Sequence, residues 1–126
     1  MKRDWNLMGD IFNALESDRI TDLIEGEGVS DEQGDLVLRH LELLIDADYV
    51  RGLEIKRSSI GIAGYSMTDP RITLQGYDFA DIVKDKKLLN KTLNLIKKAG
   101  LMVGFETLKT YAPVALKSLA TTALGV

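Results

Sequence analysis

The 126-residue sequence contains no cysteine. This absence excludes disulfide bonds, zinc sites built on thiolates and catalysis by a cysteine nucleophile, and it is consistent with a reducing cytoplasm. No apolar run approaches the ~20 residues needed to span a bilayer. The basic opening "MKRDWNLMGDIF" is interrupted by acidic and amide side chains. We therefore expect neither a membrane-spanning segment nor a signal peptide.

Side chains that commonly carry catalysis are also scarce. His40 is the single histidine, and a histidine-based triad or metal site needs partners that the chain lacks, so we interpret His40 as a packed or capping residue. Acidic residues at 22, 25 and 27 lack the spacing of a calcium loop. "GIAG" at 61–64 lacks the Gly-Lys-Ser/Thr that completes a phosphate-binding loop. We expect a non-enzyme with no cofactor and no metal.

Charge is distributed unevenly along the chain, although the net charge is only −3. Residues 1–48 contain 4 basic and 13 acidic side chains, residues 49–82 contain 4 of each, and residues 83–126 contain 8 lysines and 2 acids. Such polarity can steer a partner or orient two copies of the chain against each other. The alternative is that two solvated helix faces simply differ in sign.

Apolar periodicity predicts two helices in the first half of the chain. Residues 4–16 repeat apolar side chains at intervals of three and four, with Asp4 as N-cap. Ser30 and Gln33 have the spacing of a capping box, and the helix that they open should extend to about residue 46. Residues 19–24 fit either a short strand or one helical turn. Asp48 follows the second helix at a position where glycine usually adopts left-handed backbone.

The second half begins with a predicted β-hairpin. Residues 49–57 and 60–68 alternate apolar and polar side chains around Ser58 and Ser59, and Pro70 is expected to end the second strand. Thr73 should cap a helix that turns Leu74, Tyr77, Phe79 or Ala80, and Val83 inward. A lysine-rich amphipathic helix should follow and end at Gly100. In the tail, Pro113 should kink a last helix or start a new one.

This order of elements predicts an α+β, mainly helical fold. We expect a winged-helix-like domain with a hairpin wing over residues 1–84. Residues 85–126 should form a C-terminal helical extension packed on that domain or on a second copy.

Three segments also resemble one family. "MKRDWNLMGDIFNALE", "LRHLELLIDADYV" and "ITLQGYDFADIV" occur in order before a lysine-containing helical tail. In these segments the chain resembles the phage and prophage proteins catalogued as domain of unknown function 2513. Asp48 and Tyr77 depart from that family's pattern, which prefers glycine and often histidine there. The resemblance implies a winged-helix-like fold and a phage or prophage setting, and it transfers no functional residues. We expect the protein in the cytoplasm of a bacterial host cell.

The segment "LRHLELLIDADYVRG" is typical of the end of a DNA-recognition helix followed by a wing. Its solvent face is acidic, however, and carboxylates that face phosphates oppose DNA binding. We therefore expect protein binding through an acidic helix face that comprises Glu32, Asp35, Arg39, Glu42 and Asp46. A DNA-binding regulator is the alternative, with contacts from Arg39, Arg51, Lys56, Arg57, Ser58 and Ser59.

The leading interpretation is a phage accessory protein that binds a host or phage protein. An acidic helix can occupy a basic groove as a decoy for nucleic acid, which favours an inhibitor of a host nucleic-acid-processing or defence protein. Nucleic acid is a disfavoured partner and a membrane is not expected.

The apolar stripe of the tail must be covered, because large exposed apolar patches are unusual in monomers. We expect a homodimer built mainly from residues 101–124, with self-association through Phe105, Leu108, Leu116 and Leu119.

Overall fold

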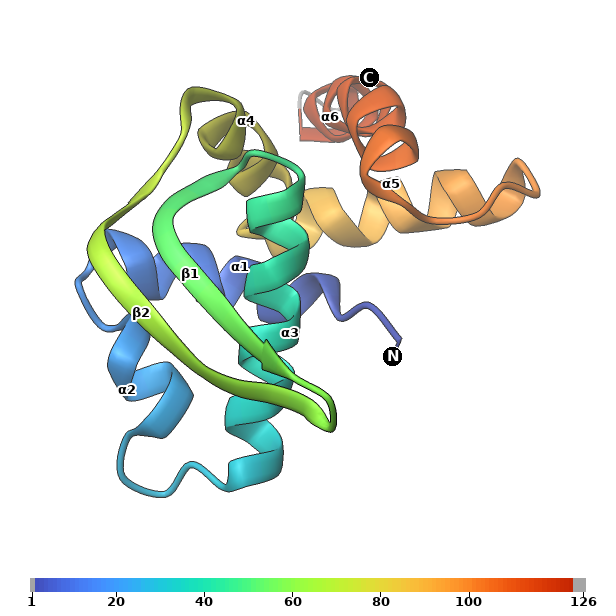
Figure 1. The fold of residues 1–126 in the computed structure, drawn as a ribbon. Coiled ribbons are helices and arrows are strands. Elements are labelled where there is room, and N and C mark those ends of the chain that lie inside the picture. The colour runs from blue at the N-terminus through green and yellow to red at the C-terminus, as the bar shows by residue number, and fades with distance from the viewer. Residues whose placement is uncertain (1, 124–126) are drawn as a thin grey trace. The chain divides into compact units, whose positions relative to one another are not determined.

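The computed structural model describes residues 2–123. Six helices and one antiparallel hairpin follow one another in these residues, and Figure 1 shows them in the order α1–α2–α3–β1–β2–α4–α5–α6. The contacts divide the chain into two compact units, one ending at Ala80 and the other beginning at Asp81. The α+β, mainly helical class predicted from the sequence is confirmed.

The first unit begins with three helices. The helix α1 spans Trp5–Glu16, and the Asp4 side chain accepts a hydrogen bond from the Leu7 N–H at 3.0 Å, as a helix N-cap does. The ambiguous segment after it is the short helix α2, Ile20–Glu25. The helix α3 spans Asp31–Asp46 and opens with the predicted capping box of Ser30 and Gln33. Asp48 has φ 63°, so it occupies the left-handed region as predicted.

The strands β1 (Val50–Ser58) and β2 (Gly61–Ile72) form the hairpin. The prediction that Pro70 ends the second strand was wrong, because β2 continues to Ile72, which pairs with Val50. The register shifts between Arg51 and Leu53, opposite the residues around Pro70. A proline has no N–H to donate, and this irregularity is a place where the strand tolerates one.

Thr73 connects the hairpin to α4 (Leu74–Val83). Its hydroxyl accepts a hydrogen bond from the Gly76 N–H at 3.0 Å and donates one to the Asp48 carbonyl oxygen at 2.7 Å. Phe79, Ala80 and Val83 are buried as predicted. Leu74 and Tyr77 were predicted to face inward and do not: 80% of Leu74 and 47% of Tyr77 are exposed.

An aromatic cluster lies at the centre of the first unit. The fully buried ring of Phe79 stacks on Tyr49 with centroids 5.0 Å apart. It also meets Trp5 and Phe12 edge-on at 6.3 and 6.2 Å. Because these rings come from α1, the start of the hairpin and α4, the cluster holds segments together that are distant in sequence.

The second unit contains α5 (Lys86–Lys98) and α6 (Phe105–Ala123), which pack against each other. Asp85 caps α5, and Gly100 follows its end with φ 72°. The helix α6 runs through Pro113 as one element. Among the helices of residues 2–123, none combines the length and the apolar character that crossing a bilayer requires.

Candidate functional site

The hairpin tip lies beside α3, as Figure 1 shows. Arg57, near the tip, donates hydrogen bonds from Nε and Nη2 to the two carboxylate oxygens of Glu42, with Nε 2.7 Å from Oε2. At the turn itself, the Arg39 guanidinium approaches Gly61. Residues predicted for protein binding and residues predicted for DNA binding therefore meet on one surface.

The charges on this surface largely pair with one another. Nε of Arg39 lies 2.7 Å from Oδ2 of Asp35, and Arg57 binds Glu42. The hydrogen bond from Arg57 holds the pKa of Glu42 below its ordinary value, and the positive charge of Arg57 acts in the same direction against partial burial. The same contact raises the pKa of Arg57. Each arginine is therefore paired with a carboxylate, whose negative charge opposes the binding of a phosphate at the same place.

The other predicted residues of this region remain at the surface. Glu32 and Asp46 are exposed on α3. Arg51 binds Asp48 through two hydrogen bonds of 3.0 Å, and this contact lowers the pKa of Asp48. The hairpin residues Lys56, Ser58 and Ser59 are also exposed.

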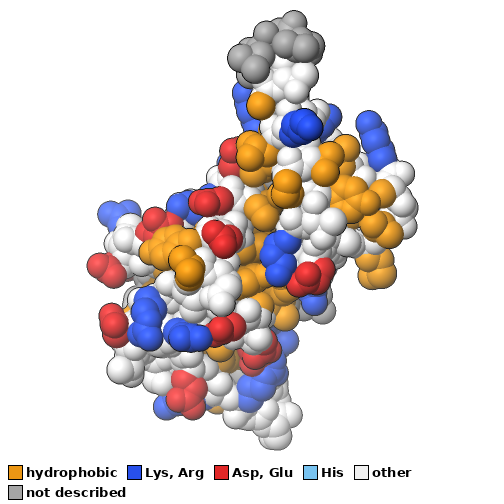
Figure 2. Space-filling view, turned by 90° about the horizontal axis from the view of Figure 1, so that it is seen from above, with side chains coloured by type: hydrophobic (Ala, Val, Ile, Leu, Met, Phe, Trp, Pro, Cys, Tyr) orange, Lys and Arg blue, Asp and Glu red, His pale blue; other side chains and the backbone are white. Residues whose placement is uncertain are grey.

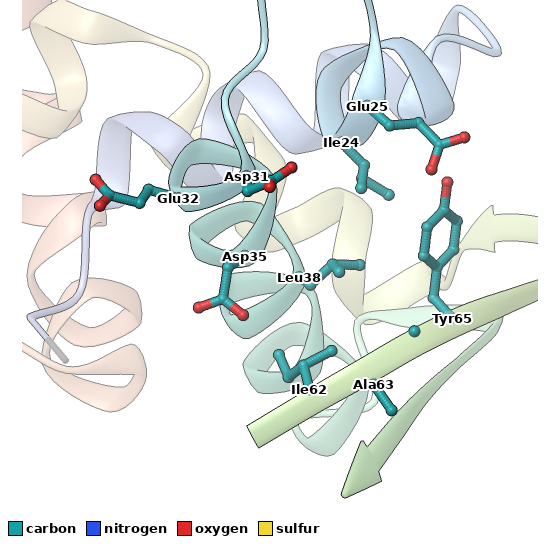
Figure 3. A pocket seen from close by; sticks show the side chains of 11 residues that line it. Ile24, Glu25, Asp31, Glu32, Asp35, Leu38, Ile62, Ala63 and Tyr65 are labelled. Atoms are coloured by element: carbon teal, nitrogen blue, oxygen red, sulfur yellow. The ribbon is translucent and has the colours of Figure 1, made fainter. Parts of the chain in front are cut away.

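A groove of about 530 Å³ lies between α2, the first turns of α3 and the start of β2. Its apolar lining includes Ile24, Leu38 and Ile62. Its carboxylates come from α2 and α3: Glu25, Asp31, Glu32 and Asp35. In Figure 3, Glu25 lies beside the Tyr65 hydroxyl, whereas Glu32 and Asp35 project from the other side of α3. The groove thus combines an apolar lining with negative charge.

Tyr65 closes one side of this groove. Its hydroxyl makes hydrogen bonds with Glu25 and Thr21. Burial raises the pKa of Tyr65, and the hydrogen bond and negative charge of Glu25 raise it further. No pattern in the sequence indicated Tyr65, Ile24 or Ile62 as site residues. The alternation of apolar and polar residues in β2 predicted a strand. It did not indicate which helix that strand would pack against.

His40 is fully buried and belongs to the scaffold, not to the groove. Its Nε2 accepts a hydrogen bond from the Asp4 N–H, and its Nδ1 lies 2.8 Å from the Leu36 carbonyl oxygen. In the described part of the chain, no group of three or more metal-ligating side chains is placed to hold an ion.

The residues predicted for self-association differ in exposure. Leu108 is fully buried, Phe105 and Leu119 are half-buried, and 56% of Leu116 is exposed. Exposed apolar side chains elsewhere include Ile60 at the hairpin turn and Met102 after α5. Figure 2 shows hydrophobic side chains at the surface among charged side chains of both signs.

The chain is thus an α+β, mainly helical protein with a two-stranded hairpin and an acidic groove. A family model described as "Hypothetical protein (DUF2513)" matches residues 2–102. The chain belongs to this family, as the sequence segments indicated. No curated protein and no solved structure matches it.

Proposed function

We propose that the chain is a non-enzymatic protein-binding module that receives basic side chains of a partner along the acidic side of α3. The groove beside that helix is the main observation that supports this proposal. Lysine and arginine have apolar stems and charged heads, so a stem can cover Ile24 and Ile62 while the head approaches Asp31 or Glu25. Electrostatic attraction of this kind accelerates association and selects basic partners.

The proposed partner is a host protein that handles nucleic acid, including defence proteins. Such proteins present basic surfaces to phosphates, and the acidic side of α3 can occupy such a surface in place of nucleic acid. The family membership and the resemblance to phage and prophage proteins support a bacterial cytoplasm as the setting. Inhibition of the partner would follow from competition for its basic surface.

A charge-reversal experiment tests this proposal. The full chain and the variant Asp31→Lys/Asp35→Lys are used as baits in a bacterial lysate, and captured proteins are identified by mass spectrometry and then purified. Direct titration should show that the variant binds the purified partner at least roughly tenfold more weakly. The control Asp10→Lys/Asp78→Lys makes the same change of charge on exposed residues of α1 and α4. Equal weakening in both variants would contradict the proposal.

A DNA-binding regulator remains the second candidate, and one observation favours it. The hairpin turn is exposed, with Ser58, Ser59 and a 96% exposed Ile60 beside Lys56. A wing of this composition can contact a DNA backbone. Against it, Glu42 already holds Arg57 and the neighbouring helix face carries several carboxylates.

Electrophoretic mobility shifts separate the two candidates. With DNA that flanks the chain's own gene, our proposal predicts no sequence-specific complex at physiological ionic strength. A tight, sequence-specific complex that weakens with salt and disappears in Arg57→Ala would support the regulator instead.

A further inference from the structure

The solvent face of α5 carries positive charge with no acidic counterpart. Five lysines lie in this helix: Lys86, Lys87, Lys91, Lys97 and Lys98. Within residues 2–123, none of these lysines makes an ion pair. Leu88, Leu89, Thr92 and Ile96 form the buried face of the helix. At 3.6 residues per turn, Lys87, Lys97 and Lys98 lie on the opposite side, and Lys91, which is half-buried, lies nearer its edge.

We propose that the groove between α2, α3 and β2 docks the lysine face of α5 from a second copy of the chain. The contact is reciprocal, so that each copy presents its α5 to the groove of the other. This inference goes beyond the proposed function, because it identifies an occupant of the groove in the free protein. An external partner would compete with that occupant.

The groove and the helix α5 carry opposite charges. The groove is lined by Glu25, Asp31, Glu32 and Asp35. Among residues 2–123, Arg39 is the one basic group that forms an ion pair with any of them, so the groove remains negative. The helix α5 contains lysines and no acidic residue. It is the most basic of the helices described between residues 2 and 123, and its lysines provide charged heads on apolar stems.

The spacing of lysines along α5 matches the spacing of carboxylates along α3. Asp31 and Asp35 lie four residues apart on α3, and Lys87 and Lys91 lie four residues apart on α5. In each pair the charges are thus about 6 Å apart along the helix axis, from the rise of 1.5 Å per residue. A helix that lies alongside α3 can therefore place one lysine near Asp31, on the side of Ile24, and the next near Asp35, which projects from the other side of α3 (Figure 3).

Reciprocity is required because one contact alone is weak. Exposed ion pairs contribute little individually and are screened by salt. A two-fold arrangement forms the contact twice and closes on itself, whereas a head-to-tail arrangement would continue into open chains. This interface is distinct from the apolar tail, where Leu108 is already buried within one chain.

A pair of charge-reversed variants tests the docking. One variant reverses the groove, Asp31→Lys/Asp35→Lys, and the other reverses the helix, Lys87→Glu/Lys91→Glu. Mass is measured by light scattering and dissociation constants by sedimentation, with circular dichroism to confirm folding. The wild type should dimerise at roughly 0.05 M NaCl, and its dissociation constant should rise at least about tenfold at roughly 0.5 M NaCl. Each variant alone should be monomeric.

Mixing the two variants is the decisive step. In the mixture the acidic groove of one faces the basic helix of the other, and the acidic helix of the first faces the basic groove of the second. A heterodimer should therefore form between the two folded variants. The control Asp10→Lys/Asp78→Lys should dimerise like the wild type.

Three results would overturn the inference: a wild type that stays monomeric at low salt, variants that dimerise as well as the wild type, or variants that fail to associate when mixed. The helix-reversed variant keeps the groove intact, so the proposed function is tested separately. If partner binding fails in this variant and self-association behaves as expected, the proposed function alone is wrong.

Discussion

Nε2 of His40 accepts a hydrogen bond from the backbone N–H of Asp4, at 2.8 Å. The other ring nitrogen, Nδ1, lies 2.8 Å from the Leu36 carbonyl oxygen, which can only accept, so Nδ1 carries the proton. Both nitrogens are therefore occupied, and the ring has no free nitrogen for a substrate or a metal. Because Asp4 caps α1, His40 connects the start of that helix to the middle of α3.

Replacement of His40 tests this structural role. His40→Phe keeps a ring of similar size and leaves the Asp4 N–H without its acceptor, which should cost about 1–3 kcal/mol of unfolding free energy. His40→Gln retains an acceptor and should cost less. Urea denaturation of both variants measures the difference. A His40→Phe protein as stable as the wild type would show that the hydrogen bond contributes nothing to stability.

Two glycines mark places where backbones approach closely. A Cβ at Gly34 would collide with the Ile24 carbonyl oxygen, and one at Gly76 with the Tyr49 carbonyl oxygen. Gly34→Ala and Gly76→Ala should each lose about 1–3 kcal/mol, because the clash is with backbone that cannot move easily. The control is Gly64→Ala, where a Cβ meets nothing within 4 Å. Thermal unfolding of the three variants checks the order, and a loss in Gly64→Ala equal to the others would contradict it.

Features set by neighbouring residues were predictable from the sequence. The capping box of Ser30 and Gln33, the cap at Thr73 and the left-handed Asp48 all formed as expected. Each depends on residues within a few positions of one another. The segment at 19–24 remained ambiguous because six residues fit a strand or a helical turn equally well. Its identity as a helix depends on burial of Ile20 and Ile24, which tertiary packing decides.

The inward face of α4 shows where periodicity alone fails. Leu74 and Val83 fit one apolar stripe, but the helix turns Phe79 and Ala80 into the core and leaves Leu74 exposed. The contact of Phe79 with three other aromatic rings decides that rotation, and those partners come from distant parts of the chain.

Contacts between residues that are distant in sequence also explain why part of the site could not be predicted. Helical spacing predicted the acidic side of α3. The pair of Glu42 and Arg57 was not, because it depends on the register of the hairpin, which shifts between Lys56 and Arg57. The same register brings Ile62 and Tyr65 to the groove. Nothing local to these residues indicates which helix they face.

Two leucines of opposite environment provide a matched test of the core. Leu41 is fully buried on α3, and 80% of Leu74 is exposed on α4. Leu41→Ala should cost about 2–5 kcal/mol through lost burial and the cavity left behind. Leu74→Ala should change stability by less than about 0.5 kcal/mol, as surface substitutions usually do. Denaturant midpoints of the two variants decide the matter, and similar losses would mean that the rotation of α4 is wrong.

The ion pair between Glu42 and Arg57 should make stability depend on pH in a defined window. The hydrogen bond from Arg57 holds the pKa of Glu42 below its ordinary value of 4.5 in the folded chain. The Glu42 carboxylate therefore takes up a proton at a higher pH in the unfolded chain than in the folded chain. The stabilisation should be complete above the unfolded pKa and should disappear as the pH falls through the folded pKa.

A double-mutant cycle isolates this contribution from the rest of the protein. The wild type, Glu42→Gln, Arg57→Met and the double variant are unfolded with urea at intervals from about pH 7 to about pH 3. The coupling between positions 42 and 57 should favour the folded state at neutral pH, decline below about pH 4.5 and vanish at the acidic end. Added salt should also reduce it, because both side chains are partly exposed. A coupling that stays constant across this range would mean that the ionised Glu42 is not the partner that holds Arg57 and the hairpin tip beside α3.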